Sequence, residues 1–238
     1  LQIYPCPEGW DFPECAAFSG VFLTAYHALF RVAKVEAGET LLIHSAAGGV
    51  GTALLQLGSI AGCRSIAVVG AAFKAQLCRD LGATAVIDRS EQDLWTQAER
   101  LSPKGYDAIF DANGVSTLRH GFNHLAHGGR LVVYGFADIM PRGKAKPTLL
   151  DMAWNYINVP KFSPLDMTTT NRGVMGFNVV FLFHKMELAV KGMKEMLVWI
   201  QEGRIRKVPV TLFPLERVAD AHRAIESGKT TGKLVLTI

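Results

Sequence analysis

The sequence predicts an α/β protein built on a doubly wound parallel sheet, as in the Rossmann fold. Short apolar runs alternate with segments of helical spacing between residues 41 and 134. This alternation is typical of a parallel sheet with helices on both faces. The first apolar run leads through a glycine-rich turn straight into a helical segment. With 238 residues and 49% hydrophobic content, the chain is long enough to bury a sizeable core.

Five strands and the helices between them follow from the apolar runs and the glycine breaks. We expect strands at residues 41–43, 66–69, 85–87, 106–111 and 130–134. We expect helices at residues 14–32, from 52 up to Gly62, and at 74–81, 91–101 and 118–125. The first of these helices is mostly apolar and free of proline, so it is predicted to be buried. Residues 1–14 carry three prolines and a glycine and are predicted to be irregular.

The rest of the chain does not continue this strict alternation. Residues 136–182 are rich in Pro, Asn, Met and Thr and are predicted to be irregular. After them the pattern predicts a helix, a strand, a helix and a strand, at residues 186–201, 208–213, 215–227 and 233–238. We therefore expect this tail to belong to a second structural unit.

The glycine-rich turn is the strongest candidate for a binding site. In a fold of this kind a dinucleotide pyrophosphate lies on the backbone N–H groups where the first helix begins, and glycines allow its close approach. The usual fingerprint is G-x-G-x-x-G, but here Ala46 stands in the first position. Glycine-rich helix starts also serve packing alone, and only the surrounding alternation favours binding. The candidate cofactor-binding residues of this turn are Ala46, Ala47, Gly48, Gly49, Val50 and Gly51.

The end of the second strand indicates which dinucleotide is bound. NAD-specific sheets usually place an acidic residue there to bind the ribose 2′-OH, but here the strand ends at Gly70 without one. Lys74 follows and offers a positive charge to a 2′-phosphate. Arg89, after the third strand, is either a second cation or a stacking partner for adenine. The pattern favours NADP(H), although both side chains also suit solvated surface positions.

Composition excludes several other kinds of function. A net charge of +4 with scattered basic residues gives no support for a nucleic-acid partner. The densest basic cluster lies at residues 142–146 and is expected to be a solvated loop. We expect no apolar run of the length that a bilayer requires, about 20 residues, and no signal peptide is evident. These observations predict a cytoplasmic protein without an integral membrane segment.

Cysteine and histidine spacing gives little support for a metal site. The four cysteines lack C-x-x-C spacing, so they are expected to be reduced, buried thiols. His120 and His124 have the spacing of a metal pair on a helix, but no further ligand follows them closely. An ordinary amphipathic helix is the preferred interpretation, and no metal is expected.

Several motifs together resemble the zinc-free quinone oxidoreductase branch of the medium-chain dehydrogenase/reductase superfamily. The chain looks similar to the zeta-crystallin type and to the vesicle-membrane-protein homologues. The motifs run in the family's order over nearly the whole chain. They are Leu23-Thr-Ala-Tyr-His-Ala-Leu29, His44-Ser-Ala-Ala-Gly-Gly-Val-Gly51, Leu81-Gly-Ala83, Phe110-Asp111, Gly128-Gly-Arg-Leu131, Gly176-Phe177 and Gly232-Lys233.

The resemblance implies an NADPH-dependent reductase of quinones or activated alkenes. By family analogy Thr24 reaches the nicotinamide end, while Asn113, Tyr134 with Gly135, and Phe177 lie near the nicotinamide ribose or ring. Tyr134 is the one proton donor that the resemblance suggests. Each of these residues also has a plainer interpretation, as a turn at Asn113 and as packing at Tyr134 and Phe177. The rival function is a nucleotide-binding module without turnover: a sensor, a scaffold or a vesicle-associated partner.

The resemblance also implies a domain division. Residues 15–183 match the nucleotide-binding domain, while residues 1–14 and 184–238 match the remnant of a GroES-like catalytic domain whose first part is absent here. The tail is then expected to expose a sheet edge and apolar surface. A homodimer is expected through a sheet edge formed by residues 130–136.

Overall fold

A computed structural model describes residues 3–139 and 157–238. Six parallel strands form the main sheet in the order β3-β2-β1-β4-β5-β6. Their bounds are β1 Thr40–Ile43, β2 Arg64–Val69, β3 Ala83–Asp88, β4 Tyr106–Asp111, β5 Leu125–Val133 and β6 Gly173–Gly176. The strand order reverses between β1 and β4, as in a doubly wound sheet, so the Rossmann prediction is confirmed.

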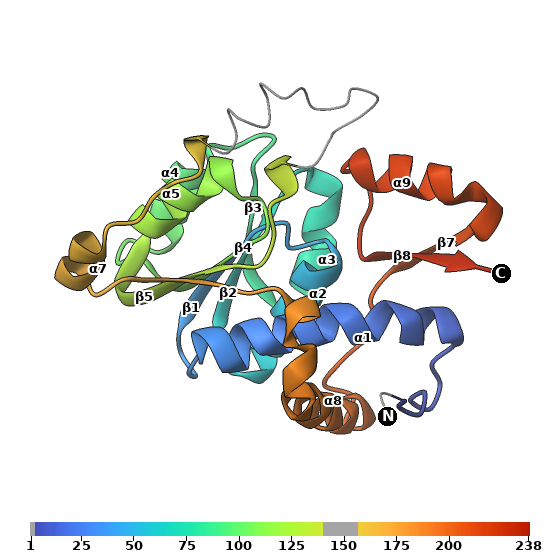
Figure 1. Cartoon of the computed structure of the whole chain (residues 1–238). Coiled ribbons are helices and arrows are strands. Elements are labelled where there is room, and N and C mark those ends of the chain that lie inside the picture. Colours follow the sequence, from blue (N-terminus) through green and yellow to red (C-terminus); the bar gives the residue numbers. More distant parts are fainter. Residues whose placement is uncertain (1–2, 140–156) are drawn as a thin grey trace.

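Helices cover both faces of this sheet (Figure 1). The α-helices are α1 Phe12–Tyr26, α2 Gly49–Ile60, α3 Ala75–Asp80, α4 Leu94–Leu101, α5 Val115–Asn123, α7 Pro164–Thr170, α8 Met186–Gln201 and α9 Val218–Glu226. A π-helix, η1 His27–Ala33, continues α1, and the 3-10 turns are η2 Ala72–Lys74, η3 Ala137–Ile139, η4 Val179–Lys185 and η5 Leu215–Arg217.

Strand β1 contributes side chains to the hydrophobic cores on both faces of the sheet. Leu41 and Ile43 pack with α1, α2 and α8 on one face, whereas Leu42 packs with α4 and α5 on the other. All three side chains are fully buried. Because successive side chains of a strand point to opposite faces, a continuous apolar run marks a strand that is covered on both sides.

The first helix differs from its predicted bounds at both ends. Residues 12–14 were predicted to be irregular, but α1 begins at Phe12 because Asp11 and Glu14 form a capping box, each side chain accepting from the other's backbone N–H at 2.8 Å. With η1 the helical stretch runs to Ala33, which makes it long and apolar enough to cross a membrane by length and composition. The prediction that no run reaches this length was therefore wrong. Phe18 and Phe22 of this helix lie in the core, as is common for the central helix of an α/β domain.

The sheet edge also differs from the prediction. Residues 173–176 form a sixth strand within the stretch predicted to be irregular, and β6 pairs with β5 from Arg130 to Val133. Strand β5 is therefore paired on both sides, so residues 130–136 are not the open edge expected for a homodimer. The edge on this side of the sheet belongs to β6.

The tail forms a strand–helix–strand unit of its own (Figure 1). Strands β7 Val210–Pro214 and β8 Lys233–Thr237 pair in parallel, with α9 between them in the chain. Leu212 and Leu236 are exposed, which agrees with the expectation of apolar surface on the tail. Helix α8 packs through Met193 and Met196 into the core beside α1. The domain division at residues 183 and 184 stays a prediction.

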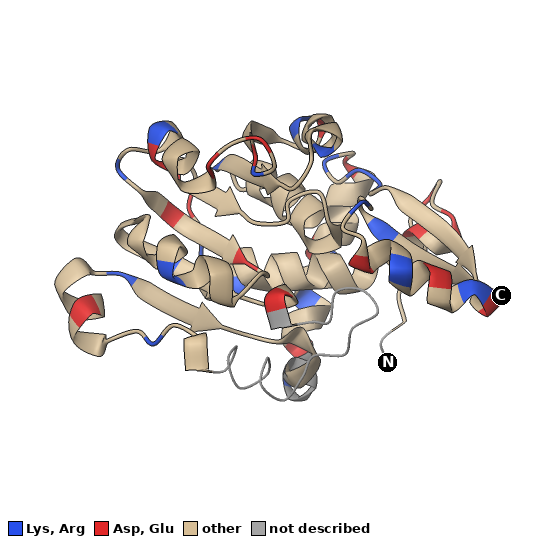
Figure 2. Cartoon of the chain, turned by 90° about the horizontal axis from the view of Figure 1, so that it is seen from above, with Lys and Arg blue, Asp and Glu red and all other residues tan. Residues whose placement is uncertain are grey.

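Two expectations about side chains need correction or limitation. Of the four cysteines, Cys6 is exposed, Cys15 and Cys63 are partly buried, and only Cys78 is buried, so the expectation of uniformly buried thiols was wrong. The basic cluster at residues 142–146 lies outside the described residues. Over the described chain, Figure 2 shows both signs of charge spread among many elements.

Candidate functional site

The glycine turn joins β1 to α2 in a conformation that only small residues allow. Ser45 adopts a left-handed backbone conformation with φ +52°, and α2 begins after Gly48 without a side-chain cap. A Cβ on Gly51 would lie 2.5 Å from the Ser45 carbonyl oxygen and from the Ala46 Cα. The N-terminus of α2 therefore keeps unpaired N–H groups close to the preceding turn, as a phosphate site requires.

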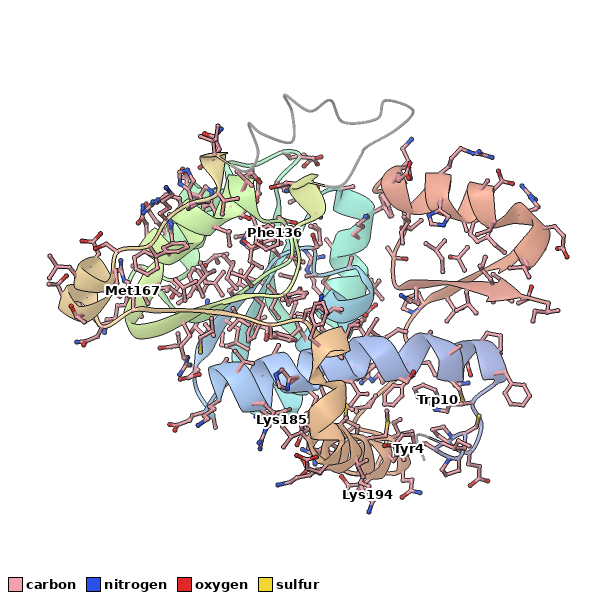
Figure 3. The ribbon with its side chains drawn as sticks, in the orientation of Figure 1. Tyr4, Trp10, Phe136, Met167, Lys185 and Lys194 are labelled. Carbon is pink, nitrogen blue, oxygen red and sulfur yellow. The ribbon has the colours of Figure 1, made fainter. Side chains whose placement is uncertain are left out.

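A second turn lies beside the first, at the point where the strand order reverses. Ser45 follows β1 and Asn113 follows β4, and the Ser45 hydroxyl donates to the Asn113 Oδ1 at 3.0 Å. Asp111 fixes the second turn by accepting from the Asn113 N–H at 2.7 Å, the Gly114 N–H at 3.0 Å and the Thr117 hydroxyl at 2.6 Å. Figure 3 shows Phe136 close to this turn, where its ring packs against Gly114.

His44 lies beneath these turns and is fully buried. Its Nε2 is 3.8 Å from the nearer Asp111 oxygen, and neither ring nitrogen has a hydrogen-bond partner within the described part of the chain. Burial lowers the pKa of His44, and the Asp111 charge opposes this effect only in part. The imidazole is therefore neutral near pH 7.

A pocket of about 690 Å³ opens at this edge of the sheet. It contains six of the predicted cofactor residues, and the rest of its lining was not predicted. The six are Ala47, Gly48, Gly70, Lys74, Arg89 and Asn113. The others are Ser45, Val69, Ala137, His222, Ile225, Glu226, Ser227, Gly228 and Thr230. This volume suits a cofactor-sized ligand.

The basic side chains gather at the end of the pocket formed by β2 and β3. Lys74 donates from Nζ to the Gly228 carbonyl oxygen at 2.5 Å. Burial lowers the pKa of Lys74, and the nearby Arg89 charge adds to this effect. The Arg89 guanidinium makes no hydrogen bond or ion pair to any residue that the structure describes, so it is available to an anionic ligand.

The tail closes the opposite side of the pocket. The Gly232 N–H donates to the Ala47 carbonyl oxygen at 2.8 Å, and Gly48 and Gly232 form an isolated β-bridge. The glycine turn and the tail are therefore in direct contact through their backbones. The sequence contained one signal for this contact, the family motif Gly232-Lys233, but nothing in its spacing placed it beside residue 47.

The remaining predicted residues fall into two groups outside the pocket lining. The first group belongs to the glycine turn but does not line the pocket: Ala46, Gly49, Val50 and Gly51. Thr24, Tyr134, Gly135 and Phe177 lie elsewhere, with the Phe177 ring 4.9 Å from His27 and 6.3 Å from Tyr134. The Thr24 hydroxyl donates to the Gly20 carbonyl of its own helix at 2.8 Å. Their proximity to a nicotinamide stays a prediction.

Tyr134 is partly buried and its phenol holds its proton tightly. Burial raises the pKa of Tyr134 well above its ordinary value, and the Asp111 charge raises it further. The side chain is therefore a neutral phenol at all physiological pH values. It can donate a proton only to a group that becomes strongly basic during a reaction.

No metal centre is found in the residues described. Within residues 3–139 and 157–238, no group of three or more His, Cys, Asp or Glu side chains is placed to hold a metal ion. His120 and His124 instead stack on Trp95, with ring centroids 5.4 and 4.6 Å away. His124 also lies 3.2 Å from the Glu99 carboxylate.

Comparison with known proteins identifies the family. A family model described as zinc-binding dehydrogenase matches residues 81–236. The rat synaptic vesicle membrane protein VAT-1 homolog is 32% identical over 99% of this chain, and the chain spans 58% of that relative's length. The human VAT-1 homolog is also 32% identical, with 60% of its length covered.

Solved structures agree with this assignment. The quinone oxidoreductase of Thermus thermophilus, also solved in complex with NADPH, is 30% identical with a TM-score of 0.80, covering 99% of this chain and 69% of that one. The Escherichia coli quinone oxidoreductase complexed with NADPH is 25% identical with a TM-score of 0.80, covering 99% and 68%. The chain therefore belongs to the zinc-binding dehydrogenase family of the medium-chain dehydrogenase/reductase superfamily, in the branch that resembles the zinc-free quinone oxidoreductases.

Proposed function

We propose that the chain binds NADP(H) in the pocket between the glycine turn and α9, as part of an oxidoreductase that reduces a quinone or an activated alkene. One observation carries the proposal: a single pocket joins the glycine turn at the start of α2 to Lys74 and Arg89 beside β2 and β3. No carboxylate follows β2 directly, so nothing there repels a 2′-phosphate. The two quinone oxidoreductases compared above, both solved with NADPH, support this choice of cofactor.

The residues present fit this cofactor. The tight backbone approach at Gly51, where a Cβ has no room, leaves the α2 N–H groups open to a pyrophosphate. Lys74 and Arg89 would hold the 2′-phosphate, while Asn113 would face the ribose next to the nicotinamide. When bound, the nicotinamide supplies the hydride.

The protein would position the cofactor, exclude water from the nicotinamide and supply a proton to the substrate. The Asp111 hydrogen bonds fix the Asn113 turn, so the groups that face the cofactor are preorganised. The Phe177 ring, which packs on the His27 ring, supplies apolar surface that would exclude water on the nicotinamide side. We assign the proton donor to Tyr134, whose Oη would protonate the strongly basic α-carbon of the enolate formed as an activated alkene accepts hydride.

A second candidate function is NADP(H) binding without turnover. The chain spans 58% of the length of the rat relative, and Thr24, Tyr134 and Phe177 lie outside the pocket lining. A chain that binds the cofactor without completing a substrate site would act as a sensor, a scaffold or a vesicle-associated partner. The VAT-1 homologs carry a vesicle membrane association in their names.

Titration of the purified chain with NADPH and NADH, followed by the fluorescence of its four tryptophans, tests cofactor binding. We expect saturable quenching with tighter binding of NADPH. Loss of absorbance at 340 nm with excess ortho-quinone then tests turnover. Binding with substrate-dependent oxidation supports the reductase, whereas binding without oxidation supports the module. NADH binding at least as tight as NADPH binding contradicts the assignment of Lys74 and Arg89.

The proposal extends to location and assembly. We propose a cytoplasmic protein that forms a homodimer through the open edge of β6 rather than through β5. Sedimentation velocity distinguishes monomer from dimer, and Val174→Pro in the middle of β6 should shift a dimer towards monomer because proline removes a strand donor. Cell fractionation separates a cytoplasmic protein from one held on vesicles.

A further inference from the structure

Helix α9 forms one wall of the proposed cofactor pocket. His222, Ile225 and Glu226 all line it. Their spacing of three and four residues places them on a single helix face. Figure 1 shows α9 near α3, the helix that follows Lys74, and the Lys74–Gly228 hydrogen bond joins the two regions. The tail is therefore part of the binding site and not only its neighbour.

Three basic side chains from three separate elements line this pocket. Lys74 comes from η2, Arg89 follows β3, and His222 comes from α9. Glu226 is the one carboxylate among the residues that line the pocket. Lys74 and Arg89 together outweigh the charge of Glu226 for a doubly charged anion, and a protonated His222 would add a further positive charge.

We infer that His222 binds the 2′-phosphate of NADP(H) in its protonated form and makes the preference for NADPH over NADH depend on pH. This inference rests on the proposed binding of NADP(H) in this pocket. Histidine is the side chain whose charge changes between pH 5 and 8. A phosphate contact from His222 would therefore gain a charge as the pH falls, whereas Lys74 and Arg89 gain none over this range.

Charged groups surround His222 on its own helix and in the pocket. Glu226 lies one helical turn from it on the same helix face, and Lys74 and Arg89 line the same pocket. Arg217 and Arg223 are held by ion pairs to Asp220. Of the other elements packed against α9, η5 carries Glu216 and Arg217, β7 carries no titratable side chain and β8 carries Lys233.

The test compares His222→Gln with the wild-type chain. Glutamine keeps hydrogen-bonding capacity but cannot acquire the charge, and His222 is exposed, so the variant should fold. His127→Gln is the matched control, because His127 is exposed on β5 and does not line the pocket. Dissociation constants for NADPH and NADH are measured by fluorescence between pH 5.5 and pH 8.5. Taking the ratio of variant to wild type at each pH removes the effect of the 2′-phosphate titration on the contacts that both proteins share.

For NADPH we expect this ratio to be about three to five at pH 6, the range of an exposed ion pair, and to approach one above pH 8. For NADH, and for both cofactors with His127→Gln, the ratio should stay near one at every pH. A ratio that does not vary with pH, or that is the same for NADPH and NADH, overturns the role of His222. If wild type binds NADPH selectively and the variant matches it, only this inference fails; if wild type does not bind NADPH, the proposed function fails as well.

Discussion

Replacing Gly51 by alanine tests whether the glycine turn is as tightly built as its geometry indicates. The new Cβ would lie 2.5 Å from the Ser45 carbonyl oxygen, 2.5 Å from the Ala46 Cα and 2.6 Å from the Ala46 carbonyl oxygen. All three are backbone atoms, so no side-chain rotation can relieve the contact. The turn from Ser45 to Gly48 must move, and the N–H groups at the start of α2 move with it.

The size of the effect follows from the cost of overpacking a core, about 1–3 kcal/mol. In a chain of this length each kcal/mol lowers the melting temperature by about 2–4 °C. We therefore expect Gly51→Ala to melt roughly 2–12 °C below wild type. It should also lose most of its NADPH binding, since the displaced turn no longer fits the pyrophosphate.

Two further glycines provide matched controls. A Cβ on Gly48 would contact the Ser45 oxygen at 3.2 Å, a distance that a small shift can relieve, and one on Gly20 of α1 meets nothing within 4 Å. Gly48→Ala should melt close to wild type, and Gly20→Ala should gain about 1 kcal/mol from helix propensity. Thermal unfolding followed by circular dichroism measures all three variants. A Gly51→Ala protein that melts and binds like wild type would refute this account of the turn.

Three further predictions concern charge and protonation. Lys74→Glu should weaken NADPH binding by about ten- to a hundredfold, the value of a hydrogen bond to a charged group, and NADH binding far less; equal losses in a fluorescence titration would remove Lys74 from the phosphate site. Tyr134→Phe should lower the turnover of an activated alkene roughly a hundredfold without changing NADPH affinity. Because the pKa of Tyr134 is raised, wild-type turnover should show no basic decline below about pH 10 from this group. His44 has a lowered pKa in the folded state, so only the unfolded chain takes up its proton and stability falls below about pH 6.5. In urea titrations at several pH values, His44→Leu should make that fall shallower, and an unchanged slope would assign it to other groups.

The main sheet and its glycine turn were predictable because their signals are local. Residues 41–43 form a continuous apolar run, residues 46–51 follow at once, and both features depend only on neighbours in the chain. The same holds for the α8 bounds, which match the prediction from Met186 to Gln201. Local patterns of this kind indicate whether a segment prefers a strand or a helix, and in these segments the folded chain adopts the preferred structure.

Strand β6 could not be predicted for a physical reason. Its four residues, Gly173–Gly176, include two glycines, which are poor strand formers. The segment becomes a strand because β5 offers an open ladder from Arg130 to Val133. That partner is 43 residues away along the chain, beyond any local window. The misplaced dimer edge followed from the same omission.

The cofactor preference depends on residues that a motif at the end of β2 does not include. No acidic residue follows Gly70 in the sequence, which favours NADPH. In the folded chain, however, Glu226 of α9 places a carboxylate in the lining of the same pocket. Local reasoning about β2 alone would therefore be incomplete even where its conclusion holds. In the proposed site, the selectivity would depend on the balance between this carboxylate and the basic groups of Lys74, Arg89 and His222. Glu226→Gln should then tighten NADPH relative to NADH, because removing the one negative lining group strengthens the field that favours the 2′-phosphate. Parallel titrations of the two cofactors measure this ratio. If Glu226→Gln instead shifts the ratio towards NADH, Glu226 does not oppose the phosphate.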